Sequence, residues 1–251
     1  MTAAVVTPGF SVFVAVNAAG LASMIPYALA GRRRDADVEG KRGQFLGGLG
    51  DFILHWFMWA LAPAVAVSRR LGLTPDFYNY LGLGLGLASG PLIATGHLEW
   101  AGWAIVLSGI ADILDGRIAR MAGLASDYGD FIDSTFDRFA EASTFLGFAY
   151  ALRDVRYGPL VAAAALAGSL IVSYARARGE VLGVHCSGGL MQRAERLVLT
   201  AFVCLVGPTV SGVFGFPGNA LVMGMLWLMA VTTLLTAVWR TIWIAARLRG
   251  R

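Results

Sequence analysis

Residues 112–137 read DILDGRIARMAGLASDYGDFIDSTFD, and the interpretation of the whole chain depends on this stretch. The 251-residue protein is 57% hydrophobic and only 14% charged, yet seven of its sixteen acidic residues lie between Asp112 and Glu141. Carboxylates in so apolar a chain are costly to bury unless they have partners or a function. Their concentration here therefore indicates a functional site.

Four of these aspartates recur at helical spacing. Asp112 and Asp115 are three residues apart, and Asp133 and Asp137 are four apart, so each pair shares one face of a helix. Two neighbouring antiparallel helices would aim all four carboxylates at one point. Oxygen ligands without nearby His or Cys favour Mg²⁺, Mn²⁺ or Ca²⁺ over zinc, and a pair of such ions suits displacement at phosphorus. The structural alternative is a salt-bridge network of these aspartates with neighbouring arginines: Arg117, Arg120 and Arg138.

Two further residues of the stretch suit a phosphate-bearing ligand. Gly116 lies four residues after Asp112 on the same helix face, so a pyrophosphate or a substrate backbone can approach closely there. Arg120 adds a fixed positive charge that matches a phosphate oxygen.

The rest of the chain is typical of an all-α integral membrane protein. Its mean hydropathy is +0.66, and several uncharged runs reach the roughly 20 apolar residues that cross a bilayer. We expect an extra N-terminal transmembrane helix within residues 1–31, a cytoplasmic linker with an interfacial juxtamembrane helix within 32–72, and a six-helix catalytic transmembrane domain over 73–251. The interfacial helix is predicted over residues 52–68.

The expected helices of the six-helix domain are bounded by turn signals. Thr74 and Pro75 are typical of an N-cap and a first helical residue. Glycines at every fourth position after them predict a face for close helix packing rather than a nucleotide-binding loop, because no strand precedes them. The spans are predicted over 77–98, 100–121, 129–152 and 157–175, with two more in 197–239, broken at Gly207-Pro208 and at residues 216–218.

The arginines orient these helices. Seventeen of the nineteen fall on one side of the predicted membrane, and only Arg153 and Arg156 lie on the other, which places the acidic stretch in the cytoplasm. The net charge of +4 in so hydrophobic a chain favours anionic lipid and phosphate substrates over nucleic acid as partners. Cys186 and Cys204 are expected to be free thiols with no metal role, because no ligand spacing accompanies them.

The spacing of the acidic stretch resembles the signature of the CDP-alcohol phosphotransferase family at every position. The matching residues run Asp112-x-x-Asp115-Gly116-x-x-Ala119-Arg120, then eight residues, then Gly129-x-x-x-Asp133-x-x-x-Asp137. The resemblance implies transfer of a phosphatidyl group from CDP-diacylglycerol to a small alcohol with release of CMP. It also implies a homodimer in a bacterial or archaeal cytoplasmic membrane, with the six-helix core over residues 73–246.

The same resemblance implies roles for individual residues. Two divalent cations, Mg²⁺ or Mn²⁺, would be bound by Asp112, Asp115, Asp133 and Asp137, and Asp137 would also be the general base. The CDP-lipid would contact Asp112, Gly116, Ala119, Arg120, Gly129, Thr74, Pro75 and Asn79. Asn79 replaces a threonine of the family pattern.

The acceptor is indicated by weaker similarity. Residues 173–180 and 193–196 resemble segments of actinobacterial phosphatidylinositol-phosphate synthases, which implies inositol phosphate as the acceptor. Its phosphate would be bound by Arg138, Arg176, Arg178, Arg193 and Arg196. The alternatives are a phosphatidylglycerophosphate synthase or another acceptor within the family, arginines that only anchor lipid headgroups, and, outside the family, an ion-coupled transporter that uses the aspartates.

Overall fold

The structure, a computed structural model, describes residues 6–30, 48–186 and 188–250. These residues form helices joined by turns, with no strand among them. In chain order the helices are α1 (Pro8–Leu29), α2 (Gly48–Arg70), α3 (Pro75–Ala94), α4 (Leu98–Ala122), α5 (Asp127–Ala151), α6 (Gly158–Val181), α7 (Arg193–Phe214) and α8 (Ala220–Arg249).

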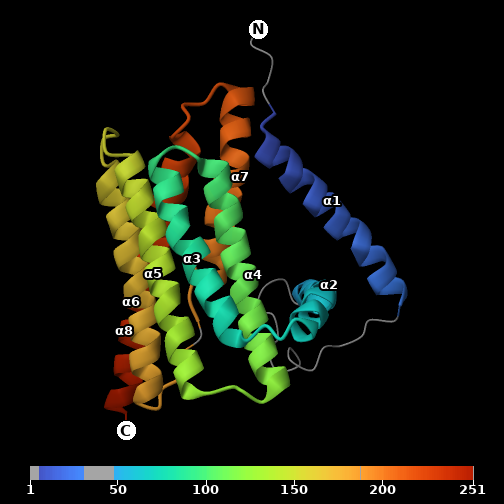
Figure 1. Cartoon of the computed structure of the whole chain (residues 1–251). Coiled ribbons are helices and arrows are strands. Elements are labelled where there is room, and N and C mark those ends of the chain that lie inside the picture. The colour runs from blue at the N-terminus through green and yellow to red at the C-terminus, as the bar shows by residue number, and fades with distance from the viewer. Residues whose placement is uncertain (1–5, 31–47, 187, 251) are drawn as a thin grey trace.

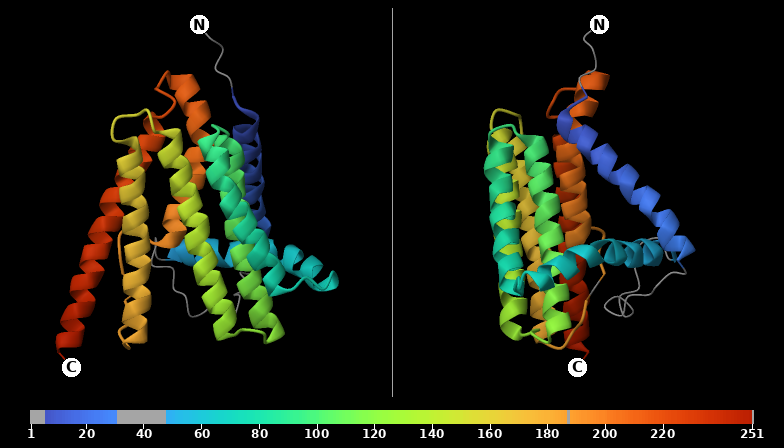
Figure 2. Two further views of the ribbon diagram at one scale, coloured as in Figure 1. Left: turned by 60° about the vertical axis from the view of Figure 1, so that its left-hand side comes forward. Right: turned by 45° about the vertical axis from the view of Figure 1, so that its right-hand side comes forward.

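Helices α3 to α8 run up and down beside one another in a bundle, while α2 lies across one end of it and α1 leans away at an angle (Figures 1 and 2). The turn between α4 and α5 is at the same end as α2, and we call this the site end. Helix α3 packs on both α4 and α5, α4 on α7, and α6 on α8. The two helices that carry the acidic stretch, α4 and α5, thus both pack on α3, and the predicted all-helical fold is confirmed.

Three predicted boundaries move. Helix α3 ends at Ala94 rather than at residue 98, because Gly96 adopts a left-handed φ of 82° and Leu98 already begins α4. Helix α6 continues past residue 175 to Val181. Helix α7 runs through Pro208 to Phe214, so the predicted break at Gly207-Pro208 is wrong; Gly215, at φ 69°, ends the helix instead.

Five helices of the described residues are long and apolar enough to cross a membrane: α1, α2 from Gly50 onwards, α6, α7 and α8. Helices α4 and α5 are not among them, and they carry the acidic stretch. Helix α2 qualifies by composition although its axis lies across the bundle (Figure 2). The predicted linker, residues 32–50, lies outside the described residues up to residue 47, and Gly48 already begins α2.

The glycine face of α3 works as expected, by bringing helices close together. A Cβ atom at Gly86 would lie 2.4 Å from the Cβ of Ala140 on α5, and one at Gly90 would lie 2.3 Å from the carbonyl oxygen of Ser143. Only glycine permits this approach. Beside it, the buried hydroxyls of Ser89 and Thr144 form a hydrogen bond of 2.7 Å. The α3–α5 contact fixes the rotation of α5, and with it the direction of its aspartates.

Candidate active site

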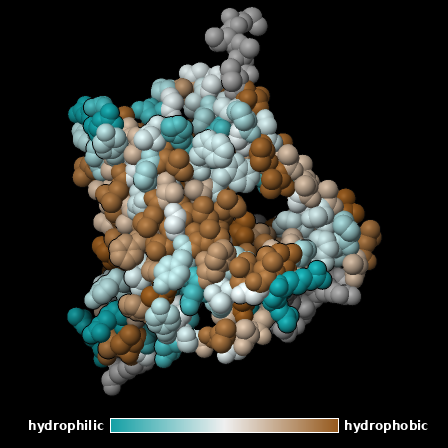
Figure 3. Space-filling model, viewed as in Figure 1, coloured by the Kyte–Doolittle hydropathy of each residue, from teal (hydrophilic) through white to brown (hydrophobic). Residues whose placement is uncertain are grey.

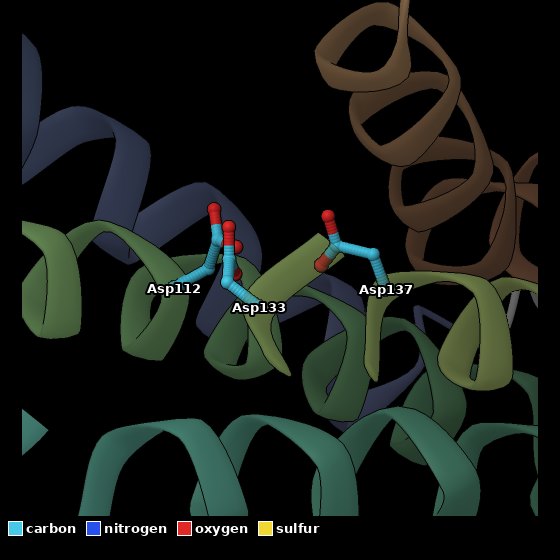
Figure 4. A group of neighbouring side chains, drawn as sticks. All are labelled: Asp112, Asp133 and Asp137. Carbon is cyan, nitrogen blue, oxygen red and sulfur yellow. The ribbon is translucent and has the colours of Figure 1, made fainter. Parts of the chain in front are cut away.

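Three carboxylates from the acidic stretch meet near the site end. One oxygen each of Asp112, Asp133 and Asp137 lies within 4.8 Å of the other two. Asp112 lies on α4. Asp133 and Asp137 lie on successive turns of α5, and their side chains point toward Asp112 (Figure 4). Like charges this close repel one another, so the group needs a cation to be stable.

The donor set fits a divalent metal. All three groups are hard oxygen ligands, as Mg²⁺ and Mn²⁺ prefer, and no His or Cys joins them in the described cluster. Asp115, the fourth predicted ligand, is not in this group of three. Asp115 is 5% exposed, and its Oδ1 accepts a hydrogen bond from the backbone N–H of Gly116. It lines the same cavities as Asp112 and Asp133.

One guanidinium enters this carboxylate cluster. Arg193, the first residue of α7, donates to both oxygens of Asp112 at 3.2 and 3.3 Å and to Oδ1 of Asp137. Arg138 lies 3.4 Å from the other oxygen of Asp137. The structure thus joins two of the predicted acceptor arginines to the aspartates, although 81 residues separate Arg193 from Asp112.

A cavity of about 670 Å³ opens beside the carboxylates, between α2, α3, α4 and α5. All eight residues predicted to contact the CDP-lipid line it: Thr74, Pro75, Asn79, Asp112, Gly116, Ala119, Arg120 and Gly129. They come from three helices and span more than fifty residues of sequence. The structure therefore brings the whole predicted set to one space.

Local structure explains how several of these residues are placed. The Thr74 hydroxyl accepts from the backbone N–H of Phe77, which caps α3 as predicted, and Pro75 follows as the first helical residue. Gly129 donates its N–H to the hydroxyl of Ser126, which caps α5. A Cβ at Gly116 would come within 3.1 Å of Nη1 of Arg120, so the glycine makes room for this guanidinium along the cavity wall.

Arg196 has a different environment from Arg193. Its side chain is 3% exposed and pairs with Glu141 of α5 at 2.7 Å, while Nη1 donates to the carbonyl of Met191. Glu141 also accepts a 2.5 Å hydrogen bond from Ser169 of α6. This buried network ties the start of α7 to α5 and α6, one helical turn beyond Arg193.

The remaining predicted acceptor residues lie on the surface of α6. Arg176 is half exposed and pairs with Glu180 at 2.9 Å, and Arg178 is exposed. Neither lines the cavities around the carboxylates. The structure does not bring these two arginines to Asp137.

Several residues around the site were not predicted from the sequence, and two of them make defined contacts: Glu141 and Met58. Glu141 follows Asp137 by four residues, so its place on the same helix face was a usable signal. Met58 of α2 lines the large cavity and accepts a hydrogen bond of 2.7 Å from Arg117 at its carbonyl oxygen. Nothing in the sequence around Met58 marked it.

Comparisons with known proteins point to one family. The sequence pattern of the CDP-alcohol phosphatidyltransferase family matches residues 52–243. The chain is 34% identical over 203 residues to the phosphatidylinositol phosphate synthase of Streptomyces avermitilis, covering 77% of this chain and 81% of that one. It is 34% identical over 187 residues to the synthase of Mycobacteroides abscessus, covering 71% and 80%.

Solved structures agree. The crystal structure of the Mycobacterium tuberculosis phosphatidylinositol phosphate synthase with CDP-DAG bound superposes with a TM-score of 0.64 at 29% identity, covering 72% of this chain and 92% of that one. A second structure of that enzyme, in complex with manganese and citrate, gives a TM-score of 0.63 at 30% identity, covering 72% and 87%. The acidic signature, the helical bundle and these matches agree that the chain belongs to the CDP-alcohol phosphatidyltransferase family.

Proposed function

We propose that this integral membrane transferase moves the phosphatidyl group of CDP-diacylglycerol to inositol phosphate, giving phosphatidylinositol phosphate and CMP. In this reaction the acceptor hydroxyl oxygen bonds to the lipid-side phosphorus of the pyrophosphate. The bond from that phosphorus to the bridging oxygen breaks, and CMP leaves with the electron pair. The proton of the hydroxyl goes to a base of the protein.

One observation carries the proposal: the eight residues predicted to contact the CDP-lipid line one cavity that ends at the carboxylate cluster. A cavity of about 670 Å³ falls within the usual size of small-ligand sites, roughly 300–1,000 Å³. Arg120 in its wall suits a pyrophosphate oxygen, and Gly116 leaves space for the guanidinium beside it. The cavity therefore suits the nucleotide end of the donor.

The carboxylates would hold two divalent cations, with Mg²⁺ the expected ion and Mn²⁺ the alternative. Asp112, Asp133 and Asp137 are the ligands supported by geometry, and Asp115 lies beside them. Bound cations would supply charge stabilisation for the pyrophosphate and the leaving CMP. Asp137, which does not line the large cavity and contacts Arg138 and Arg193, would take the proton of the acceptor hydroxyl.

The acceptor's phosphate would bind on the Asp137 side, where Arg138 and Arg193 lie. An arginine can bind a phosphate in bidentate fashion, and Arg193 already uses both terminal nitrogens, Nη1 toward Asp112 and Nη2 toward Asp137. Arg196 would act behind them through its pair with Glu141. Arg176 and Arg178 would reach the acceptor only from the surface of α6.

The membrane orientation follows from the arginines. The site end carries most of the described arginines, so we place it in the cytoplasm, where CDP-diacylglycerol presents its nucleotide to water. We also expect a homodimer, as the family resemblance implies. The four aspartates lie in the halves of α4 and α5 nearest the site end rather than along the whole bundle, which does not suit the ion pathway of a transporter.

The test is a CMP-release assay with protein purified into lipid nanodiscs, CDP-diacylglycerol and Mg²⁺. Inositol phosphate, inositol and glycerol 3-phosphate are compared as acceptors. We expect the highest kcat/KM with inositol phosphate. A preference for glycerol 3-phosphate would make the protein a phosphatidylglycerophosphate synthase, and no CMP release with any acceptor would refute the proposed reaction.

A further inference from the structure

Helix α1 is an addition to the family fold. The residues that match the family begin at residue 52, so α1 lies entirely outside them. Most of its side chains face outward, and Tyr27, at 2% exposed, is its one buried residue. Hydrophobic residues in its middle, such as Val16 and Leu21, are more than half exposed. Such a helix is not held by a continuous packed face.

The first end of α1 is fixed to the bundle at the end opposite the site. The Thr7 hydroxyl hydrogen-bonds the hydroxyl of Thr209 on α7 at 2.7 Å. The backbone N–H of Gly9 donates to Glu99, in the first turn of α4, at 3.0 Å. A Cβ at Gly9 would lie 2.4 Å from that carboxylate oxygen, so this joint requires glycine.

The second end of α1 is fixed to α2. The Tyr27 ring packs between Phe52 and Trp59, with ring centroids 5.5 and 5.6 Å away, and Trp56 donates its indole N–H to Ser23 at 2.9 Å. Near the first end, Phe13 also packs on Phe202 of α7, with ring centroids 6.1 Å apart. Beyond this contact α1 leans away from the bundle, and the space-filling view shows an opening there (Figure 3). Helix α1 thus connects the far end of the bundle to α2 without packing along its whole length.

The part of α2 that α1 holds is the part beside the cavity. Met58 lies between Trp56 and Trp59, lines the cavity and receives the hydrogen bond from Arg117 of α4. The C-terminal half of α2 is anchored separately, where Val65 is buried against α3 and α4. Pro63 lies between the two halves and removes one hydrogen bond of the helix. Anchoring of the C-terminal half therefore does not by itself fix the N-terminal half.

We propose that α1 is a strap that positions the N-terminal half of α2 against the donor cavity, with Tyr27 as its positioning residue. The strap matters for the binding of the nucleotide end of the donor and not for the acceptor, whose arginines lie on α5 and α7. The inference rests on the proposed function, because it assigns the large cavity to the donor.

The experiment compares Tyr27→Ala with Ile25→Ala, which changes a 64% exposed residue of the same helix. Both variants are studied in nanodiscs, with the KM for each substrate, kcat, the melting temperature and amide hydrogen exchange in residues 50–60 as readouts. We expect Tyr27→Ala to raise the donor KM about five- to tenfold, the size of effect that lost aromatic pairs produce. The acceptor KM and kcat should stay within about twofold, and exchange in α2 should become faster. Ile25→Ala should match the wild type.

A second variant acts from the other end. Gly9→Val opens the joint with Glu99 far from the site, and it should raise the donor KM in the same direction. An unchanged donor KM in both variants, or an equal rise in both KM values with a lower melting temperature, would overturn the strap. If the wild type released no CMP, the proposed reaction would fail, and calorimetric binding of CDP to the same variants would still decide whether α1 positions α2.

Discussion

The cavity beside Asp112 and the arginines beyond Asp137 are assembled in different ways. The eight residues predicted to contact the CDP-lipid come from three consecutive helices, α3 to α5, and all of them meet there. The five predicted arginines come from α5, α6 and α7, and they divide into three environments: two at the carboxylates, one in a buried network and two on the surface. The residues around the cavity, which we call the donor side, could therefore be predicted from the sequence. The positions of the arginines beyond Asp137, which we call the acceptor side, could not.

The difference has a physical cause. Residues three or four apart on a helix share a face whatever the rest of the fold does, so the spacing of the acidic stretch already determines which groups lie together. The direction of an arginine at the start of α7 depends on how that helix packs against α4 and α5. The long, flexible side chain of an arginine can also reach several carboxylates, so the sequence does not show which one it pairs with. The predictions below test the two sides against each other.

The largest effect is expected for Asp137→Asn, the residue where the two sides meet. Asparagine keeps the size and one oxygen ligand but cannot take a proton, so CMP release should fall about 10³-fold, within the range for general bases. Mn²⁺ binding should be largely retained. Asp127→Asn, an exposed carboxylate in the first turn of the same helix, is the matched control and should be active. Residual activity above about a tenth would remove the base role.

Next in size is Arg196→Met, which tests whether this arginine is structural. Loss of the guanidinium leaves Glu141 without its cation, and broken buried pairs cost about 3–5 kcal/mol of unfolding free energy. The double variant Glu141→Leu/Arg196→Met should lose less than the sum of the single variants. Denaturant titration in micelles measures both. Unchanged stability together with a raised acceptor KM would instead make Arg196 a phosphate ligand.

A smaller effect is expected for Arg193→Ala. Removal of a bidentate guanidinium from the acceptor's phosphate should raise the acceptor KM about 10- to 100-fold, whereas the affinity for CDP stays within about twofold. Mn²⁺ should bind at least as tightly as to the wild type, because Arg193 contacts Asp112 and Asp137, the proposed metal ligands. Equal losses for donor and acceptor would show that Arg193 does not distinguish the two sides.

The smallest effects are expected on α6. Arg176→Ala breaks a half-exposed pair with Glu180, and Arg178→Ala removes an exposed charge. Such surface pairs contribute about 0–1 kcal/mol, so the acceptor KM should change less than about threefold. A change as large as that of Arg193→Ala would mean that the end of α6 moves to the acceptor when it binds.

Much of the fold was predictable because its signals are local. Uncharged runs and turn residues predicted the six helices of the core, and Thr74 capped α3 as expected. Two predicted boundaries were wrong at a single proline and a single glycine. Pro208 lies within α7, where the sequence had suggested a break. Gly96 adopts a left-handed φ, so α3 ends earlier than the apolar run had suggested.

The sequence by itself determined the helical membrane fold, the family and the faces on which the aspartates and the glycines lie. These follow from hydropathy and from the helical period, which act over a few residues. Only the tertiary structure decided that three of the four aspartates approach one another within 4.8 Å, that Arg193 joins them while Arg196 pairs with Glu141, and that α1 reaches α2 beside the cavity. Each of these depends on how helices distant in sequence rotate and pack against one another. The residues of the acidic stretch, 112–137, do not determine those contacts.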